Sequence, residues 1–568
     1  MTKSLEHGGP DAQRVFVDHR EHVALGHRRL SILELSELGA QPMTSASGRY
    51  ILTFNGEIYN FPTLRYELES CGQVFRGRSD TEVLAAAWEV WGSGAVQRLR
   101  GMFAFAVWDR DRSVLTLVRD RLGVKPMYFF VGKDCFLFAS ELKAFKFHPQ
   151  FTAQISTDSA AEFLQKSYIA APNTIFENTY KLPPAHYLEV SANGKISTHR
   201  YWQATDYVED GCGETESEND EEYLARLEAL LTESIRIRSV ADVPVGCFLS
   251  GGIDSSLVAA LLQSTASNRL KTFCIGFDAS GFDEALFARN VANHLGTDHT
   301  EIYCSQSDAI DAIAELPSVF DEPFGDSSAV PTYLVSRLAR ESVKVAMSGD
   351  GGDELYYGYP SLFRMERIRR IQEMPFSSLL RTLRLIKPEV VTGIFYALAP
   401  LLPKISSPGE KFEKLSRVLS TRDLGMQLSE LGSAFTADRI NNLVTLPWQP
   451  RSPEIRTVKS DRTAMILSYI EGWLPDDALV KVDRASMAHG LEVREPLLDH
   501  QLVQFALSSA HKFKFRDGQT KWALRQILYK HVPRQFIDRP KQGFAVPLDL
   551  WLRDGLQDLC NTYLSKDH

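Results

Sequence analysis

The amino-acid sequence predicts an α+β domain, then an open α/β domain with a parallel sheet, and a mainly helical C-terminal part. Three observations lead to this fold class. Short β-branched and aromatic runs, separated by Gly, Asp and Asn turns, dominate residues 1–200. From about Tyr223, helical segments alternate with single apolar strands, which is typical of a parallel sheet with helices on both faces. From Arg364 onward the pattern is mostly helical.

The first domain is expected to be built on antiparallel sheets. Two segments between its strands have helical periodicity, Thr81–Trp91 and, more weakly, Thr63–Glu69. Strands and helices mixed in this way indicate packed layers of sheets and helices. The expected strands are Tyr50–Phe54, Met102–Trp108, Val114–Arg119, Met127–Val131 and Phe136–Ala139.

An acidic segment, Tyr207–Glu222, follows the first domain. It is poor in apolar residues, so it cannot bury a core and is typical of a solvated connector. We therefore predict a first domain at 1–203, a linker at 204–222 and a second domain at 223–568.

The second domain is expected to place a ligand at one edge of its sheet, because open parallel sheets bind ligands at the carboxyl ends of their strands. Ser250, Phe277 and Ser348 lie at or just beyond three such ends, so we expect them to converge on one nucleotide. The expected strands are Val243–Leu249, Thr272–Phe277 and Val343–Met347, and the expected helices are Tyr223–Ile237, Ser255–Gln263, Phe287–Leu295 and Thr332–Glu341.

Composition excludes several classes of protein. The chain has 568 residues, a net charge of −9 and a pI near 5.9, which argues against nucleic acid or an anionic membrane as the principal partner. No apolar stretch reaches the roughly 20 residues of a membrane helix, and the N-terminus has no secretory signal. Seven scattered cysteines without a CxxC pair suit reduced thiols. We therefore expect a cytoplasmic protein whose partners are small molecules rather than nucleic acid or a membrane, and its oligomeric state, a homodimer included, stays open.

The most informative motif is SGGIDSS, which begins at Ser250 directly after a predicted strand. Gly251 and Gly252 let the backbone approach a phosphate closely, and the hydroxyls of Ser250 and Ser255 can donate to its oxygens. The start of the following helix adds a positive dipole. Asp254 suits a magnesium ion carried on the phosphate. The motif resembles the pyrophosphate loop of enzymes that cleave ATP between the α and β phosphates; the alternative is an ordinary Gly-Gly turn that caps a helix.

A second glycine-rich turn, SGDGGDE, begins at Ser348 and again follows a buried strand. Three carboxylates within five residues are costly unless cations or donors balance them. Asp254 and Asp353 could therefore share magnesium over the phosphates of the nucleotide. The alternative is a solvated acidic turn, which is disfavoured because the turn lies where the sheet would hold the nucleotide.

Together these motifs resemble the glutamine-dependent asparagine synthetase family, class B, in order and approximate spacing over nearly the whole chain. The resemblance implies an N-terminal αββα sandwich like that of the N-terminal-nucleophile hydrolases. It also implies a pyrophosphate-loop domain of the adenine-nucleotide α-hydrolase type. Besides the two glycine-rich motifs, it rests on DEPFGDSSAVP (321–331), LPDDALVKVDRASMAHG (474–490), LEVREPLLD (491–499) and RPKQGFAVP (539–547).

The resemblance also implies the reaction. An aspartate-like carboxylate is adenylated by ATP, and ammonia then displaces AMP to form an amide. Adenylation is needed because a carboxylate is a poor electrophile, whereas AMP is a competent leaving group. Cations must offset the charge on the departing pyrophosphate, so ATP and magnesium are the expected cofactors.

The family's functional residues map onto this chain. Asp350 stands at the acidic position needed for the acyl-adenylate, and Glu492 is a plausible acceptor of a proton from ammonia. Lys541 would reach the phosphates, with Lys521 as a second candidate cation. For Arg494 we expect a structural role instead, in an ion pair with either Glu492 or Asp499. The residues implied to contact ATP are Leu249, Ser250, Gly251, Gly252, Asp254, Ser255, Ile275, Ser348 and Gly349, and those implied to hold metal are Asp254 and Asp353.

Three segments of the first domain resemble the family's glutamine pocket: HRRLSI (27–32), FNGEIYN (54–60) and SDTE (79–82). Arg29 can grip an α-carboxylate through two parallel hydrogen bonds. Asp80 and Glu57 can offset an α-ammonium. Asn55 and the N–H of Gly56 suit an oxyanion hole.

The N-terminal cysteine that serves the family as nucleophile is absent, because Met1 is followed by Thr2. HGGPD, at residues 7–11, matches a family element that normally lies about thirty residues into the chain. Neither Thr2, which is displaced, nor Cys71, which lacks an adjacent α-amine, is expected to replace the cysteine. Two explanations stay open: the sequence is incomplete at this end, or the domain is inactive and the synthetase uses free ammonia. The retained pocket residues favour the first.

Other functions remain as alternatives. A relative could amidate another carboxylate, such as a uronic acid in a polysaccharide, or could close an intramolecular amide. Asp350 disfavours the cyclising option, in which Tyr is expected. A non-catalytic scaffold would have no need for the charges of Asp254, Asp353, Glu492 and Lys541, and an enzyme acting on nucleic acid would need a basic surface.

Overall fold

The computed structural model describes most of the chain: residues 1–208, 219–277, 283–375, 386–397, 407–444, 447–450, 458, 460–538, 548–553 and 556–565. Lys541 and the segment 539–547 lie outside the described residues, as does most of the predicted acidic linker.

The first domain is centred on a six-stranded antiparallel sheet in the order β11-β10-β6-β5-β4-β3. β4 and β5 form its longest ladder, from Tyr50 opposite Asp109 to Ile58 opposite Gly101. Its strands are β3 (Met43–Thr44), β4 (Tyr50–Ile58), β5 (Gly101–Asp109), β6 (Val114–Arg119), β10 (His186–Ser191) and β11 (Ile196–Arg200).

Helices and a second set of strands complete the layers around this sheet. α1 (Phe61–Ser70) and α2 (Asp80–Trp91) pack on one face. α2 begins at Asp80, one residue before the predicted helix, because the hydroxyl of Ser79 accepts a hydrogen bond from the N–H of Glu82, a stabilising N-cap. On the other face lies a three-stranded sheet, β8 (Phe136–Ala139), β7 (Tyr128–Val131) and β9 (Thr179–Lys181), which η4 (Leu142–Phe147) and α4 (Thr157–Lys166) cover in turn.

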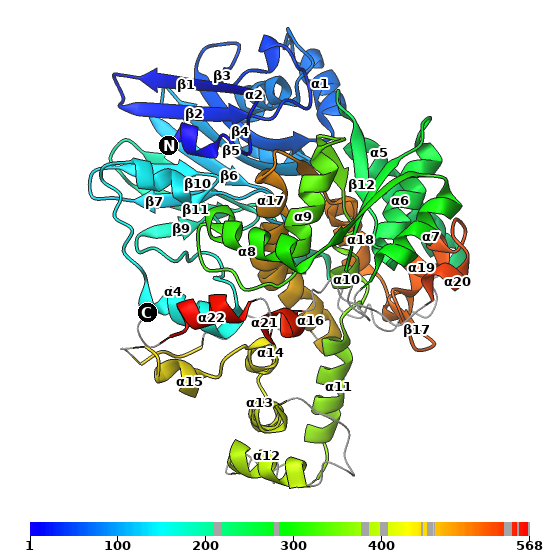
Figure 1. Cartoon of the computed structure of the whole chain (residues 1–568). Coiled ribbons are helices and arrows are strands. Elements are labelled where there is room, and N and C mark those ends of the chain that lie inside the picture. Colours follow the sequence, from blue (N-terminus) through cyan, green and yellow to red (C-terminus); the bar gives the residue numbers. More distant parts are fainter. Residues whose placement is uncertain are drawn as a thin grey trace.

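The expected αββα sandwich is therefore confirmed. A two-stranded ribbon, β1 (Ala12–Asp18) with β2 (Val23–Arg29), lies beside it. Figure 1 shows this ribbon and α1 and α2 at one end of the molecule. Short helices complete the domain: η1 (Thr2–Leu5), η2 (Glu37–Gly39), η3 (Gly92–Gly94), α3 (Ala95–Arg98) and η5 (Ala204–Tyr207).

The second domain contains the expected open parallel sheet, in the order β14-β13-β12-β15-β16. The strands are β12 (Val245–Phe248), β13 (Lys271–Phe277), β14 (Asp298–Cys304), β15 (Val345–Met347) and β16 (Glu492–Arg494). One face packs on α5 (Asp220–Arg238), α6 (Ile253–Thr265) and α7 (Ala285–Leu295), and the other on α8 (Gln306–Phe320), α9 (Ala329–Arg340) and α17 (Leu479–Met487).

The rest of the chain is helical, as expected. In Figure 1, α11 (Pro360–Gln372) leads away from the body of the molecule toward α12 (Pro388–Ala397) and α13 (Pro408–Ser420). Ten residues, Tyr469–Ala478, form a π-helix that continues α16 (Asp461–Ser468). The remaining elements are α10 (Gly352–Leu355), α14 (Leu424–Gly432), α15 (Ala437–Asn441), η8 (Pro496–Leu498), α18 (His500–Ser508), η9 (His511–Phe513), β17 (Phe515–Arg516), β18 (Gln519–Thr520), α19 (Trp522–Leu528), α20 (Arg534–Ile537), α21 (Leu548–Arg553) and α22 (Gln557–Tyr563).

Largely buried ion pairs join the two domains. Arg100 lies 2.7 Å from Asp499, Lys125 lies 3.0 Å from Asp483, and Lys181 lies 2.8 Å from Glu322. Removing one partner of such a pair leaves an uncompensated charge in a poorly solvated place, which costs several kcal/mol. These pairs therefore fix the orientation of the domains.

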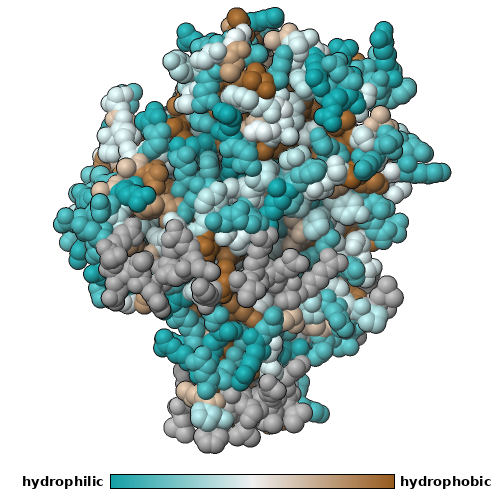
Figure 2. Space-filling model, turned by 180° about the vertical axis from the view of Figure 1, so that it is seen from behind, coloured by the Kyte–Doolittle hydropathy of each residue, from teal (hydrophilic) through white to brown (hydrophobic). Residues whose placement is uncertain are grey.

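The surface in Figure 2 is mainly hydrophilic, as expected for a chain in which 24% of the residues are charged. Hydrophilic residues predominate on the face shown in Figure 2, and apolar residues appear there in small groups. No helix among the described residues combines the length and apolar character that crossing a bilayer demands.

Candidate active sites

The loop between β12 and α6 has the geometry of an anion site. Gly251 has φ +71°, and a Cβ there would lie 2.6 Å from the carbonyl carbon of Phe287, so the turn requires glycine. The hydroxyls of Ser250 and Ser255 lie 3.0 Å apart, and the N–H of Gly252 donates to Ser250 Oγ at 3.3 Å. Hydroxyls and N–H groups thus gather at the N-terminus of α6, where the helix dipole favours an anion.

The second glycine-rich turn lies against this loop. A Cβ on Gly349 would stand 2.7 Å from the N of Ser255, and one on Gly352 would stand 2.2 Å from Oδ1 of Asp254. The two turns touch because β12 and β15 are neighbours in the sheet. The structure thus brings together the two turns that begin at Ser250 and Ser348, whereas Phe277, expected to converge with them, ends β13 with its ring beside Trp551. Leu249 and Ile275 are both buried nearby, on or beside β12 and β13.

Lys521 connects the acidic side chains of the two turns. Its ammonium contacts Asp254 and lies 2.5 Å from Oδ1 of Asp353. Burial alone would lower the pKa of Lys521, but the two carboxylates outweigh burial and hold the pKa above its ordinary value. Asp254 and Asp353 therefore face a common point, as sharing one ligand requires.

Glu495 is a buried acid that the sequence interpretation did not select. Burial raises its pKa to about 8, a rise that nearby Lys125 counteracts and Asp350 adds to. Glu495 is only 4% exposed. A carboxyl group with such a pKa is mostly protonated at neutral pH.

The pKa of Glu495 predicts a pH effect on stability. Because its folded pKa of about 8 exceeds the ordinary 4.5, the folded state holds the proton more tightly, and stability falls as pH rises from 4.5 to 8. Glu495→Gln cannot ionise, so we expect its melting temperature relative to wild type to increase with pH between 5 and 8 and to level off above. Thermal unfolding checks this, with Glu373→Gln at the exposed end of α11 as the control. A difference that does not vary with pH would contradict the prediction.

Of the two partners expected for Arg494, Glu492 and Asp499, the structure shows Glu492. The Nε of Arg494 lies 2.8 Å from Glu492 Oε1, whereas Asp499 is held by Arg100 and Arg238. Arg494 also reaches the first domain, where Nη2 lies 3.1 Å from Oε1 of Glu57. One fully buried arginine therefore contacts carboxylates on both domains.

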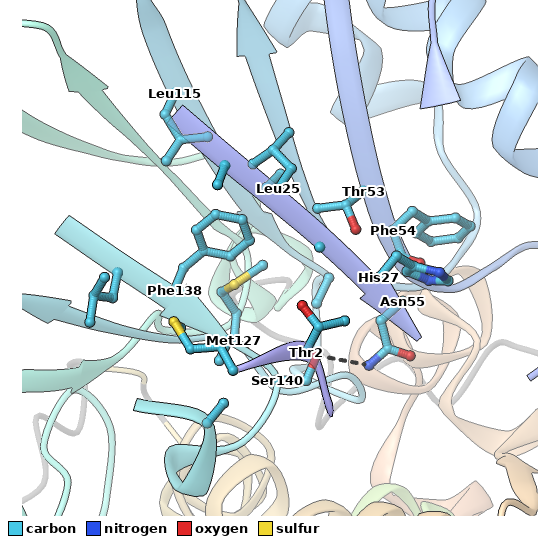
Figure 3. Close-up of a pocket in the computed structure, with 18 of the residues that line it drawn as sticks. Thr2, Leu25, His27, Thr53, Phe54, Asn55, Leu115, Met127, Phe138 and Ser140 are labelled. Carbon is cyan, nitrogen blue, oxygen red and sulfur yellow. Dashed lines mark hydrogen bonds between the residues drawn. The ribbon is translucent and has the colours of Figure 1, made fainter. Parts of the chain in front are cut away.

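The five residues expected to bind glutamine, Arg29, Asn55, Gly56, Glu57 and Asp80, all line one cavity of about 1010 Å³. Glu492 of the second domain lines the same cavity. In Figure 3, His27 and Asn55 lie on one side of it and Leu115 and Phe138 on the other.

Within this cavity the polar groups already have protein partners. Arg29 donates to the carbonyl oxygens of Ser36 at 3.0 Å and of Leu33 at 3.1 Å. Glu57 pairs with Arg494, and Asp80 accepts from the N–H of Ile58 at 3.0 Å. Burial raises the pKa of Asp80 to about 6.

Asn55 and Gly56 lie at the polar end of the cavity. Asn55 Nδ2 lies 3.5 Å from Oγ of Ser140 (Figure 3), and Thr2 also lines the cavity. Gly56 has φ +136°, and a Cβ there would stand 2.0 Å from the carbonyl oxygen of Met102, so β4 needs glycine at this point. Cys71 is exposed at the end of α1 and is not among the residues that line the cavity.

The other end of the cavity is apolar and lies between two strand edges. Leu25 of β2 and Phe138 of β8 both line it. Among the described sheets, β2 pairs only with β1, and β8 pairs only with β7.

Comparison with known proteins agrees with this two-part geometry. The profile of the glutamine amidotransferase domain family matches residues 1–202, and that of the asparagine synthase family matches residues 226–568. The chain therefore joins an amidotransferase domain to an ATP-using synthase domain. It belongs to the asparagine synthase family.

Relatives match over nearly the full chain. Asparagine synthetase [glutamine-hydrolyzing] 1 of Bacillus subtilis is 31% identical over 98% of this chain and 85% of its own length. A putative asparagine synthetase of Mycobacterium bovis is 33% identical, with coverage of 97% and 84%. Amidase chry2 of Gibberella zeae is 28% identical, with coverage of 96% and 84%.

Among solved structures, glutamine phosphoribosylpyrophosphate amidotransferase from B. subtilis is 15% identical over 61% of this chain and 76% of its own, with a TM-score of 0.27. A likeness at this level has no bearing on the assignment.

Proposed function

We propose that the protein is an ATP-dependent amide ligase that converts aspartate, ATP and ammonia into asparagine, AMP and pyrophosphate. The observation that carries this proposal is the meeting of the two glycine-rich turns, with Asp254 and Asp353 at one ammonium. Family membership supports the use of ATP and of glutamine as the amide donor.

In the proposed reaction, a carboxylate oxygen of aspartate attacks the α-phosphorus, and the bond to the departing pyrophosphate breaks. Ammonia then attacks the acyl carbon, loses a proton and expels AMP. The N–H groups and hydroxyls between Ser250 and Ser255 are suited to holding the phosphates. Asp350 and Glu492 are proposed for the acyl-adenylate step and for accepting the proton from ammonia. Lys541, outside the described residues, is proposed to contact the phosphates.

Magnesium fits the residues at this site. The described residues contain no group of three or more His, Cys, Asp or Glu side chains that could hold a metal ion. Magnesium commonly uses only one or two protein carboxylates together with substrate phosphates, and Asp254 with Asp353 supplies two. When bound, the ion would neutralise charge on the departing pyrophosphate.

A buried cluster beside the site supports an acceptor that carries an ammonium group. The ammonium of Lys481 lies 2.8 Å from Asp326. Burial alone would lower the pKa of Lys481, but Asp326, Asp477 and Asp350 outweigh burial and raise this pKa above its ordinary value. Burial and nearby Asp326 raise the pKa of Asp477 to about 8, and one of its oxygens has no hydrogen-bond partner. Two carboxyl groups thus face one ammonium. With a pKa of about 8, Asp477 is mostly protonated at neutral pH, and the α-ammonium of a bound aspartate would favour its ionised form, whereas a uronic acid has no such cation.

The test is an assay of pyrophosphate release with ATP, magnesium and ammonia across candidate acids. Aspartate should support release and yield asparagine, whereas galacturonate should not. Asp477→Asn should raise the KM for aspartate by about 10–100-fold while the KM for ATP stays near the wild-type value, because a charged hydrogen bond is lost. Release driven by a uronic acid but not by aspartate would transfer the proposal to the alternative acceptor.

For the first domain, we propose that glutamine binds in the cavity beside Asn55 and Gly56 and that ammonia reaches Glu492, because Glu492 lines the same cavity. Cleavage of glutamine needs a nucleophile that neither Thr2 nor Cys71 is proposed to supply. With free ammonia, the ligase reaction requires only the second domain's chemistry. We further propose the domain limits 1–203, 204–222 and 223–568, action in the cytoplasm on small molecules rather than nucleic acid, and a homodimer.

A further inference from the structure

Lys521 is a buried lysine that lies between the two carboxylates proposed to hold magnesium. Its side chain is buried, and its ammonium lies between two acidic side chains that come from different turns, Asp254 and Asp353. The residue itself comes from the start of α19, far along the chain from both. Three separate segments therefore meet at one positive charge.

The backbone around Lys521 fixes this arrangement. Lys521 has φ +55°, an uncommon conformation for a residue with a side chain, and its N–H donates to the carbonyl oxygen of Tyr356 at 2.9 Å. At Gly358, a Cβ would stand 2.5 Å from Cε of Lys521 and still closer to Asp353. Glycine thus leaves the space that lets the lysine and the carboxylate meet.

From this geometry we propose that Lys521 is a built-in counter-ion that occupies the position of the divalent ion until ATP arrives. An ammonium and a divalent ion cannot both approach the same two carboxylates without strong repulsion in a poorly solvated site. The phosphates of ATP give the ammonium a new partner, so metal and nucleotide bind together. This inference rests on the proposed nucleotide site, but it adds an order of binding and a role for Lys521.

The test measures metal binding without turnover. Mn²⁺ binding to the full-length protein is followed by the paramagnetic resonance of the free ion, with and without α,β-methylene-ATP. In the wild type, we expect weak Mn²⁺ binding alone and binding at least about tenfold tighter with the analogue. In Lys521→Met, we expect Mn²⁺ alone to bind at least about tenfold more tightly than in the wild type, because one positive charge is removed.

Two further variants test whether the change in Mn²⁺ binding comes from the lost charge of Lys521 rather than from the substitution of a buried lysine as such. Lys521→Arg keeps the positive charge and should bind Mn²⁺ alone as weakly as the wild type. Lys514→Met removes another buried lysine, whose ammonium donates to the carbonyl oxygen of Ser509 at 2.9 Å, and should also behave like the wild type.

Tight binding of Mn²⁺ to the wild type without nucleotide would overturn the proposal even if Lys521→Met fails to fold. Unchanged binding in a folded Lys521→Met variant would overturn it as well. No acceptor acid is present in the experiment, so a failure of the aspartate assay leaves this result intact, and the two proposals can fail separately.

Discussion

Asp353→Asn is expected to lower the rate of pyrophosphate release, with aspartate and ammonia, by about 10²–10³-fold, the usual loss when one preorganised charge at a reacting centre is removed. Asp353 supplies one of the two carboxylates that meet at Lys521. Asparagine has nearly the same shape but no charge, so the site would keep its packing and lose its attraction for a cation. We expect the loss to appear mainly in kcat, since pyrophosphate carries its full charge only as it departs.

The measurement is a continuous pyrophosphate assay at saturating ATP, with circular dichroism to establish folding. Asp517→Asn is a suitable control, because Asp517 is a highly exposed acid in the turn between β17 and β18. The control should retain the wild-type rate. A folded Asp353→Asn protein within threefold of the wild-type rate would remove Asp353 from the proposed site.

Arg494→Met is expected to destabilise the protein by about 3–5 kcal/mol, the range found when one partner of a buried ion pair is removed. The substitution leaves Glu57 and Glu492 without their shared cation. It also removes the hydrogen bonds from Nη1 to the carbonyl oxygens of Arg238 at 2.6 Å and Val240 at 2.8 Å. Burial raises the pKa of Glu57, and Arg494 counteracts this rise, so the loss of Arg494 would raise the pKa of Glu57 further.

Differential scanning calorimetry would measure this effect, and the transition that includes both domains should shift to lower temperature. The matched control is Arg236→Met. Arg236 is exposed and pairs with Glu233 one turn away, and such surface pairs contribute at most about 1 kcal/mol. Adding Glu57→Gln to Arg494→Met should recover part of the loss, since one stranded carboxylate is removed. Equal shifts for Arg494→Met and Arg236→Met would show that the buried network contributes little.

Local sequence patterns predict the order of strands and helices well. α2 starts at Asp80 because Ser79 caps it, and the predicted strands at 272–277 and 343–347 correspond closely to β13 and β15. Several strands were not predicted, and for two strands of the parallel sheet, β14 and β16, the reason is physical. β14, at the edge of the sheet, begins with four polar residues, Asp298–Glu301, so its apolar run is too short to indicate a buried strand, and β16 has only three residues.

The candidate site was partly predictable. The meeting of Ser250 and Ser348 follows from topology alone, because both turns come after neighbouring parallel strands. The pairing of Glu57 with Arg494 was not predictable, since no local periodicity links residues on different domains. For the same reason Glu495 and Lys125 were missed, although Glu495 stands inside a motif that the sequence interpretation quoted.

The ion pairs between the domains have a consequence for how such chains can be recombined. Arg100, Lys125 and Lys181 each need an acid supplied by the other half of the molecule. A chimera that takes its amidotransferase half from a distant relative would inherit charges without their partners. Each mismatched pair costs several kcal/mol, against a typical total folding free energy of about 5–15 kcal/mol. The two halves are therefore interchangeable only between chains that preserve these pairs, and they must evolve as one unit.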